Sequence, residues 1–360
     1  MATTVSAHRL QAFATTLLAA AGVPAAAAAA CARVLVAADL DGHGSHGVLR
    51  LPTYLAAIAR GQIAPRARPE IVATGPATAW VDGGQALGPV VALAAMEEAI
   101  RLARAAGAGV VAARRSNHFG AAGYYAEQAA AAGYVGLALS NTPPALPPPG
   151  GAAPYLGTNP LAFAFPTSGE PLVIDLSLSV VARGKILEAR QAGAPIPSGW
   201  AVDRAGHPTT DPAAALAGAL LPLGGPKGFA LALAVEALTG VLAGAASGPH
   251  VAQILDDTAA PANVGHLFMA LDPDRFGEPG AFRRRLDALL AELRAVPPAE
   301  GGAGVRLPGE RRAAARRRAL AEGIALPAAT VAALNSWAAR LGLADRLPAE
   351  PVSSQEEHAL

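Results

Sequence analysis

The chain has 360 residues, of which 52% are hydrophobic and 15% are charged, and its formal net charge is +1. So small a net charge excludes a field that would attract nucleic acid or a membrane surface, and an aromatic content of 4% argues against a base-stacking platform. A surface with few charges favours an oligomer with an apolar interface. The single cysteine, Cys31, excludes an intrachain disulfide and indicates a buried, inert thiol.

The first 62 residues predict a helical cap. Ser6 can cap a helix that ends at Gly22 and Pro24, and a second helix follows to about residue 38. A third helix is expected to contain residues 46–54 and to end near Gly61, with Pro52 tolerated only in its first turn or at a kink. No signal peptide is evident at the N-terminus, so we expect a cytoplasmic protein.

From about Glu70 onward, short apolar runs alternate with helical stretches, which predicts an α/β body. The apolar stretch 228–247 contains Glu236 and is rich in Ala and Gly, so it predicts a buried helix and not a membrane span. The expected division is a substrate-side cap over 1–70 joined by 311–345, a cofactor-binding body over 71–310, and a polar tail over 346–360. Strands are expected over 109–113, 134–139, 161–165, 172–176 and 266–271, helices over 88–106, 124–132, 229–242, 283–294, 311–322 and 331–341, and loops over 143–151 and 196–212.

The most informative segment is 45–54, where His46, Arg50 and Tyr54 recur at intervals of four. On an α-helix these three positions stack along one face. Such a row would combine an imidazole that can transfer a proton, a guanidinium that can bind a carboxylate, and a phenol. This combination predicts a binding site for a small hydroxy or keto acid. The alternative is a solvated helix face with no chemical role.

Residues 42–47 match the glycine pattern G-x-G-x-x-G of dinucleotide-binding turns, but the context excludes that role. The pattern works only after a strand and with an acidic residue about 20 positions on. Here a helix precedes it, and the first acidic residue downstream is Glu70. Asp39, Asp41, His43 and His46 have spacings that can chelate a metal, but no further cluster completes a site, so we predict no metal.

Three later segments place polar groups beside strands or before helices. Asn117 and His118 lie between a predicted strand and a predicted helix, where catalytic groups commonly lie, although a turn histidine without a role is the alternative. Asp175 ends an apolar strand and needs a partner, such as a ribose hydroxyl, a cation or the start of a following helix. Lys227 lies in a glycine-rich turn before the long apolar helix, an arrangement that favours a phosphate.

Taken in order, these segments resemble one family over about residues 5–345: the malate/L-lactate dehydrogenases of the non-Rossmann type, which also include sulfolactate and ureidoglycolate dehydrogenases, 2,3-diketogulonate reductase and an imine-acid reductase. The resemblance implies an oxidoreductase that uses NAD or NADP, with NAD favoured, and acts on a small 2-hydroxy or 2-keto acid. It further implies a family-specific mixed sheet flanked by helices, an N-terminal helical cap joined by C-terminal helices, and a homodimer.

The same resemblance assigns residues to roles. His118 and His46 match the catalytic positions, with His118 favoured as the proton carrier and His46 as a hydrogen-bonding partner of the substrate. Ser45, Arg50, Tyr54 and Asn117 match substrate-binding positions, and the segment after Asp175 departs from the Ala/Thr-rich run that is commoner in the family. The positions that match cofactor contacts are Ser140, Thr158, Asn159, Asp175, Leu176, Ser177, Lys227, Gly309 and Glu310.

Two other classes of protein remain as alternatives. A Rossmann-type 2-hydroxy-acid dehydrogenase requires a glycine pattern after a strand, and the chain has none. A metabolite-binding protein that lost the chemistry is disfavoured because both histidines and Arg50 are present. The sequence does not indicate which acid is the substrate.

Overall fold

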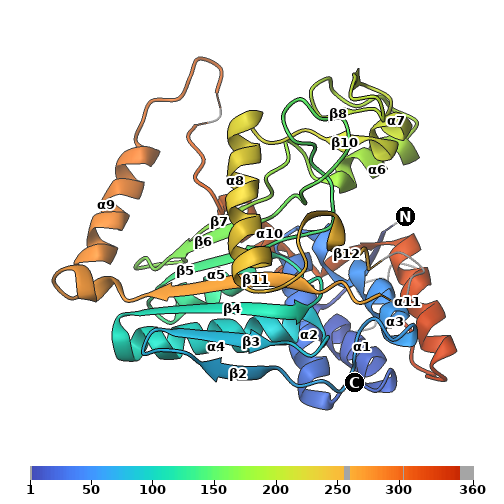
Figure 1. Cartoon of the computed structure of the whole chain (residues 1–360), viewed down its shortest axis with the longest axis horizontal. Helices are drawn as coiled ribbons and strands as arrows, with labels where there is room; N and C mark the ends of the chain where they lie inside the picture. Colours follow the sequence, from blue (N-terminus) through green and yellow to red (C-terminus); the bar gives the residue numbers. More distant parts are fainter. Residues whose placement is uncertain (1, 255–259, 303, 349–360) are drawn as a thin grey trace.

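A seven-stranded mixed sheet forms the centre of the protein (Figure 1). The computed structural model describes residues 2–254, 260–302 and 304–348. The strand order is β2-β3-β4-β11-β5-β6-β7, in which only β3 and β4 pair in parallel. The strands are β2 (Glu70–Ala73), β3 (Thr78–Asp82), β4 (Ala108–Ser116), β5 (Val135–Ser140), β6 (Leu161–Phe165), β7 (Leu172–Leu176) and β11 (Val264–Leu271).

The predicted α/β class and the mixed sheet flanked by helices are confirmed. A Rossmann domain is built from parallel strands, whereas this sheet is largely antiparallel. The glycine pattern at 42–47 follows helix α2 (Ala25–Leu40), so its exclusion as a dinucleotide turn is also confirmed. Because β4, β5 and β7 run in the same direction, their carboxyl ends lie at one edge of the sheet, near the cap.

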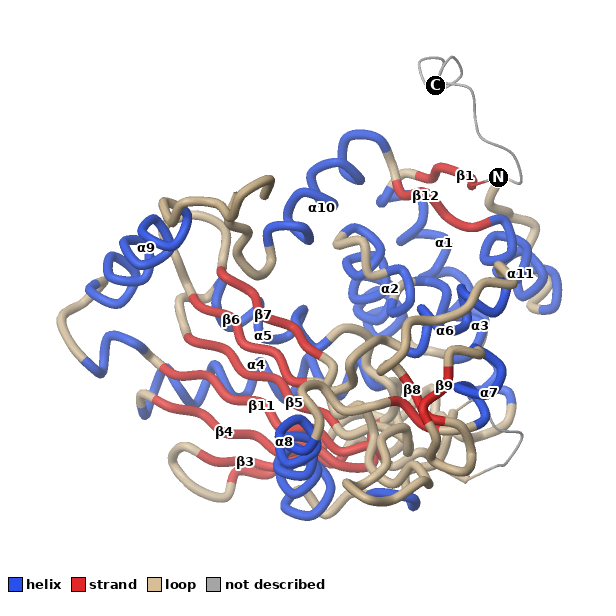
Figure 2. Tube along the Cα trace, turned by 90° about the horizontal axis from the view of Figure 1, so that it is seen from above, coloured by secondary structure: helices blue, strands red, loops and turns tan. Residues whose placement is uncertain are grey.

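Helices α4 (Gly88–Ala106) and α5 (Ala122–Ala131) cover one face of the sheet (Figure 2). Both are rich in alanine, which lets them approach the strands closely. At Gly109 a Cβ would lie 2.0 Å from the carbonyl oxygen of Ala99, and at Gly136 it would lie 2.3 Å from that of Ala126. Glycine is therefore required at both strand positions, where a helix backbone contacts the sheet.

The opposite face is covered in part by α8 (Pro226–Glu236) with the π-helical segment η3 (Ala237–Leu242), and by a lobe that includes a three-stranded sheet. The expectation of a buried helix here is wrong, because Leu233 is 52% exposed and Val241 71% exposed. Two strands of the lobe fall within the expected loop 196–212. Its elements are α6 (Arg183–Gln191), β8 (Ala201–Val202), β9 (Pro208–Thr209), α7 (Pro212–Ala217) and β10 (Ala219–Leu220).

The N-terminal helices share an apolar core with the C-terminal helix α11. Ser6 caps α1 by accepting from the N–H of Arg9, as predicted. Leu347 is buried in this core, although the sequence placed it in the polar tail; most of that tail, 349–360, lies outside the described residues. The elements are β1 (Ala2–Val5), α1 (Ala7–Ala20), α2, α3 (Leu51–Ala59), β12 (Ile324–Pro327), which pairs with β1, and α11 (Ala328–Arg340).

Helix α10 (Glu310–Glu322) joins the cap to the body through buried ion pairs. Arg312 and Arg316 both donate to Asp41, which follows α2, and to Glu127 on α5. Removing one partner from such a cluster leaves an unpaired buried charge, at a cost of about 3–5 kcal/mol. The cluster fixes α10, and with it the turn before Glu310, against the sheet.

Three peripheral elements complete the description. Helix α9 (Ala281–Arg294) projects away from the sheet, preceded by the short helix η5 (Pro273–Phe276), and η4 (Gly248–His250) follows α8 and η3 (Figures 1 and 2). Within the described residues, no helix combines the length and apolar character needed to cross a bilayer.

Candidate active site

His46 and Arg50 lie in two short 3₁₀ helices before α3, not on one α-helix. These are η1 (Gly44–His46) and η2 (Val48–Arg50), separated by the extended backbone of Gly47. The expectation that His46, Arg50 and Tyr54 share one continuous helical face is therefore wrong. Proline is tolerated only in the first turn of a helix, and α3 begins at Leu51, one residue before Pro52.

The same side chains nevertheless meet around His118. The rings of His46 and His118 stack with centroids 5.7 Å apart, and the Tyr54 hydroxyl lies 2.6 Å from Nδ1 of His118. Ser45, His46, Arg50 and His118 line one cavity. The turn from the cap thus brings its imidazole and guanidinium to the end of β4, from which His118 projects.

A buried carboxylate shapes the turn that bears His46 and Arg50. Asp39 accepts from the N–H of Val48 at 2.8 Å, and its oxygen occupies the place where a side chain at Gly47 would begin. A Cβ on Gly47 would lie 2.0 Å from the Asp39 carboxylate. Burial raises the pKa of Asp39 to about 7, although the N–H of Val48 opposes that shift.

Replacing Gly47 with alanine is expected to displace this turn, because the new methyl group cannot coexist with the Asp39 carboxylate. We expect kcat/KM to fall at least about tenfold, with a smaller effect on the fold than on activity. Steady-state kinetics and thermal unfolding measure the two effects. Gly61→Ala, at a glycine with open space around it, is the matched control, since its cost is limited to its left-handed backbone. Unchanged kinetics in Gly47→Ala would contradict this role of the turn.

His118 is held by its own loop and by Tyr54. The Tyr54 hydroxyl contacts both Nδ1 and the carbonyl oxygen of His118, at 2.6 and 3.1 Å. A hydroxyl can accept from a protonated Nδ1 and donate to an unprotonated one, so Tyr54 can hold the ring through a change of protonation. Tyr54 is buried and is not among the residues that line the cavity, so it contacts His118 from behind the cavity wall.

The electrostatic surroundings of His118 favour its neutral form. Burial lowers the pKa of His118 well below its usual value, and the positive charge of Arg50 lowers it further. Burial likewise lowers the pKa of His46 to about 4, with Arg50 again contributing. At neutral pH both imidazoles are uncharged, and an uncharged imidazole can accept a proton.

Arg50 is a half-buried cation without a carboxylate partner in the described part of the chain. Its Nε donates to the carbonyl oxygen of Ser45 at 2.7 Å, which fixes the orientation of the guanidinium. Burial lowers its pKa below the usual value. A buried charge needs a partner, so Arg50 is suited to receive an anionic ligand.

No acidic side chain lines the cavity within the described residues, whereas a second guanidinium, Arg183 at the start of α6, does. Sequence reasoning missed Arg183, although its position at a helix start after the Asp175 strand was visible. It also missed Asn141 and Thr142, which follow Ser140 at the end of β5. The cavity is therefore lined by histidines, arginines, hydroxyls and apolar side chains.

Several predicted cofactor residues line the same cavity, and others do not. Ser140, Thr158 and Ser177 line it, from the ends of β5, the turn before β6 and the end of β7. Asn117 and Asn159 are fully buried and bind other parts of the chain: the amide of Asn117 donates to Gln85 and Ala86 carbonyls, and that of Asn159 to Glu236. These two asparagines hold the loops that shape the cavity.

Asp175 accepts from the N–H of Gly123, at the start of α5, at 2.8 Å. Burial raises the pKa of Asp175 above its usual value, with the Gly123 N–H opposing. Leu176 is 43% exposed and does not line the cavity. Lys227, in the first turn of α8, is exposed and also lies outside the residues that line it.

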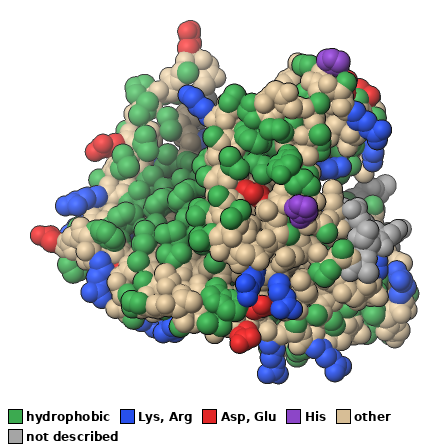
Figure 3. All heavy atoms as spheres, in the orientation of Figure 1, with side chains coloured by type: hydrophobic (Ala, Val, Ile, Leu, Met, Phe, Trp, Pro, Cys, Tyr) green, Lys and Arg blue, Asp and Glu red, His purple; other side chains and the backbone are tan. Residues whose placement is uncertain are grey.

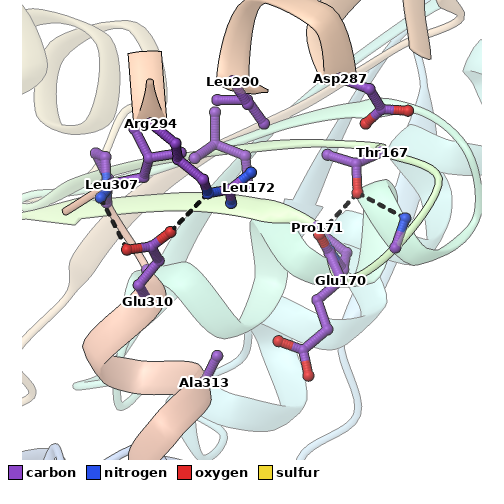
Figure 4. Close-up of a pocket in the computed structure, with 13 residues that line it drawn as sticks. Thr167, Glu170, Pro171, Leu172, Asp287, Leu290, Arg294, Leu307, Glu310 and Ala313 are labelled. Carbon is purple, nitrogen blue, oxygen red and sulfur yellow. Dashed lines mark hydrogen bonds and ion pairs between the residues drawn. The ribbon is translucent and has the colours of Figure 1, made fainter. Parts of the chain in front are cut away.

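Gly309 and Glu310 line a second pocket, between the start of β7, α9 and α10 (Figure 4). Glu310 accepts from Arg294 Nε at 3.1 Å and from the N–H of Leu307 at 3.0 Å. The carboxylates of Glu170 and Asp287 also border this pocket. Strand β7 connects the two sites, with Leu172 at the second pocket and Ser177 at the histidine cavity.

The candidate metal ligands around Asp39 have other partners. Asp41 binds Arg312 and Arg316, and Asp39 binds the Val48 N–H. Over 2–254, 260–302 and 304–348, no group of three or more His, Cys, Asp or Glu side chains is arranged to hold a metal ion.

Comparison with known proteins agrees with this geometry. Residues 5–335 match the family model for malate/L-lactate dehydrogenase. The (2R)-3-sulfolactate dehydrogenase (NADP(+)) of Chromohalobacter salexigens is 43% identical over 339 residues, covering 94% of this chain and 99% of that protein. The ureidoglycolate dehydrogenase (NAD(+)) of Escherichia coli K12 is 41% identical, covering 84% and 87% respectively.

Among solved structures, the sulfolactate dehydrogenase of Methanocaldococcus jannaschii superposes with a TM-score of 0.89 at 40% identity, covering 95% of this chain and 98% of that one. The chain belongs to the malate/L-lactate dehydrogenase family. It is an oxidoreductase of this family, a nicotinamide-dependent dehydrogenase of small hydroxy acids, which confirms the function predicted from the sequence.

Proposed function

We propose that this enzyme interconverts a small dianionic 2-hydroxy acid, of the malate or sulfolactate type, and the corresponding 2-keto acid. The observation that supports this most strongly is the half-buried Arg50, without a carboxylate partner in the described residues, beside two neutral histidines. Arg50 can bind the carboxylate through two parallel hydrogen bonds. Arg183 offers a second cationic group for an anionic substituent at C3.

Residues of the chain itself then transfer the proton of the substrate hydroxyl group. When bound, the nicotinamide ring takes up or supplies the hydride. During oxidation, His118 removes the hydroxyl proton while the C2–H electron pair leaves as hydride, and a carbonyl group forms. During reduction, protonated His118 returns that proton to the oxygen. His46 donates a hydrogen bond to the same oxygen or to the carboxylate, and Tyr54 holds the His118 ring throughout.

A panel of acids tests the reaction. With NADH, we expect oxaloacetate and sulfopyruvate to be reduced with a kcat/KM at least about tenfold above that for pyruvate, because pyruvate has no second anionic group for Arg183. The decrease in absorbance of reduced nicotinamide gives the rates. Turnover of none of the acids would leave a metabolite-binding protein as the better description, and a preference for pyruvate would remove Arg183 from the site.

The residues suited to hold the cofactor fall in two groups. Ser140, Thr158 and Ser177 surround the histidine cavity, and Gly309 with Glu310 borders the second pocket (Figure 4). At Gly309, a Cβ would lie 3.0 Å from the Val173 carbonyl oxygen, so the backbone of this turn lies close against β7. Ser177 lies five positions after Leu172, roughly 17 Å at about 3.3 Å per residue, a length suited to an extended dinucleotide.

NAD is favoured over NADP by the charges of the second pocket. Of the described residues that line it, Glu170, Asp287 and Glu310 are acidic, and Arg294, which already binds Glu310, is the cation; Glu170 also pairs with Arg317 outside the lining. An acidic residue suits the free 2′-hydroxyl of the adenosine ribose, whereas a 2′-phosphate needs an unpaired arginine. Glu310→Gln frees Arg294, and we expect the ratio of KM values for NADP and NAD to fall about tenfold. Glu278→Gln, outside this pocket, is the control; an unchanged ratio in Glu310→Gln would place the ribose elsewhere.

We also propose that the enzyme is a homodimer. Apolar side chains gather over the sheet between α9 and α8 (Figure 3), and Leu231, Leu233, Val241 and Leu242 are between 46% and 71% exposed. Monomeric proteins rarely leave so large an apolar face in water.

Leu233→Glu combined with Val241→Glu is expected to convert the dimer to a monomer, because each charge would be buried unpaired in the interface. Sedimentation velocity distinguishes the two states. Leu320→Glu, at a leucine that is 62% exposed on α10, is the control. A monomeric unaltered protein would contradict the dimer proposal.

The cytoplasmic location stays a prediction, which cell fractionation tests.

A further inference from the structure

His266 links three neighbouring strands directly behind the active-site cavity. It lies on β11, and the last residues of the flanking strands are Ser116 on β4 and Ser140 on β5. Nε2 of His266 is 2.8 Å from Ser116 Oγ, and Nδ1 is 2.9 Å from Ser140 Oγ. His266 and Ser116 are fully buried, and Ser140 is 1% exposed. A bulge between Val264 and His266 adjusts the β11 register at this point.

The hydrogen-bond lengths favour one arrangement of protons in this group, because a neutral ring has a single N–H to donate and each of the two serines also faces a backbone carbonyl oxygen. Ser140 has a single hydroxyl hydrogen, and its Oγ lies 2.9 Å from the Asn141 carbonyl oxygen, which can only accept. Ser116 Oγ lies 3.5 Å from the Asn117 carbonyl oxygen, a much longer contact, so the geometry assigns the carbonyl donation to Ser140, which then accepts from Nδ1–H of His266. Nε2 of His266 is then unprotonated and accepts from the Ser116 hydroxyl. Burial lowers the pKa of His266 to about 3, so the ring is neutral, as this arrangement requires.

This directed chain leaves Ser140 with no hydrogen to offer a ligand. Ser140 lines the cavity that contains His46 and His118, so it can meet a ligand there only as an acceptor. The ring of His266 also stacks on the ring of Phe119, with centroids 4.5 Å apart, and Phe119 follows His118 in the chain. One buried ring therefore contacts both the strand-end serine and the turn that bears His118.

We propose that His266 is a positioning residue that fixes Ser140 as a hydrogen-bond acceptor for the carboxamide N–H of the nicotinamide. This inference rests on the proposed function, because it presupposes that a nicotinamide enters the histidine cavity. A carboxamide has an N–H₂ group that donates and an oxygen that accepts. A serine that can only accept a hydrogen bond binds the N–H₂ group and not the oxygen. Ser140 would therefore determine the orientation of the carboxamide and of the nicotinamide ring attached to it.

The tautomer is tested without any ligand. In the NMR spectrum of ¹⁵N-labelled protein, we expect the His266 ring to show a protonated Nδ1 and an unprotonated Nε2. The ring signals of His266 are assigned as those that are missing from the spectrum of His266→Asn. A protonated Nε2 would overturn the proposal, since Ser140 would then donate to the ring. Ser116→Ala removes the donor to Nε2 and is expected to move the Nε2 resonance while the Nδ1 proton is kept.

Cofactor binding tests the role of Ser140. The probes are NADH and its 3-acetylpyridine analogue, in which a methyl group replaces the amide N–H₂. We expect the unaltered protein to bind NADH about tenfold more tightly than the analogue, roughly the value of one hydrogen bond. Ser140→Ala is expected to lose NADH affinity but not analogue affinity, so the ratio of Kd values falls toward one. Ser116→Ala, which leaves Ser140 in place, is expected to reduce the ratio by a smaller factor.

Thr239→Val is the matched control, because it removes another buried hydroxyl that donates to a carbonyl oxygen and does not line the cavity. Its Kd ratio should equal that of the unaltered protein. An unchanged ratio in Ser140→Ala overturns the proposal. If the unaltered protein binds both dinucleotides equally, the acceptor role of Ser140 fails alone. If it binds neither, the proposed function fails and the role of Ser140 with it.

Discussion

Replacing Arg50 with lysine raises the KM for the hydroxy acid about tenfold to a hundredfold, while kcat changes less. Lysine keeps the positive charge but cannot form two parallel hydrogen bonds with a carboxylate. One charge-assisted hydrogen bond contributes about 1.5–3 kcal/mol, which corresponds to that range. Lysine also cannot keep the bond from Arg50 Nε to the Ser45 carbonyl that orients the guanidinium. Steady-state kinetics at saturating cofactor measure the change.

The matched control is Arg60→Lys, on the same cap and after the end of α3, which does not line the cavity. It should leave KM within about twofold of the unaltered value. An unchanged KM in Arg50→Lys would remove Arg50 from the substrate site, and with it the basis for an anionic substrate. A loss of NADH binding in Arg50→Lys would instead show that the turn had collapsed.

Replacing His118 with asparagine lowers kcat by about a hundredfold to ten-thousandfold, the usual contribution of a general acid–base group. Asparagine keeps a polar side chain of similar reach but has no titratable proton. His46→Asn is expected to lower kcat less, and to raise KM, because we assign His46 to hydrogen bonding. The larger loss in His46→Asn would reverse the two roles. A loss below about tenfold in both would contradict proton transfer by either histidine.

The pH dependence of kcat/KM for oxidation follows from the same assignment. The pKa of His118 lies well below its usual value, chiefly through burial and then through the charge of Arg50. Oxidation needs neutral His118, so kcat/KM should be flat at neutral pH and fall only as the pH drops through the lowered pKa. Arg50→Gln removes a positive charge and should move this fall to higher pH, whereas Arg50→Lys should not. Coincident profiles for the two variants would contradict a direct effect of the charge on His118.

Most helices and strands of the body were predicted from the sequence. In segments such as 88–106 and 161–165, apolar residues recur with the period of a helix or a strand, because one side of the element packs against the core. The prediction failed where a distant residue determines the local backbone. The turn at Gly47 is shaped by the Asp39 carboxylate, which lies outside the segment 45–54, and Pro52 is the one local signal that a helix begins only near Leu51. The exposed apolar side of α8 was misjudged for a similar reason, since an apolar helix with an exposed side and an apolar helix in a core have the same pattern.

Candidate site residues were predicted by type more reliably than by contact. His118 and Arg50 meet in the cavity, as expected, although they lie 68 positions apart in the sequence. Asn117, Asn159 and Tyr54 were assigned to ligands, and in this structure they bind other parts of the chain. A buried histidine such as His266 shows no signal in a single sequence, because its partners, Ser116 and Ser140, lie on other strands.

Strand β7 is the last strand of the sheet, and the turn before α10 lies against its backbone at Val173. An uncovered edge strand is a template for pairing with other chains. The turn at Gly309 therefore covers part of the β7 edge against pairing with other chains, in addition to bordering the second pocket. A substitution that detaches it, such as loss of the Arg312 ion pairs that anchor α10, is expected to produce a protein that self-associates through β7 and precipitates sooner on heating than its lost stability alone would explain.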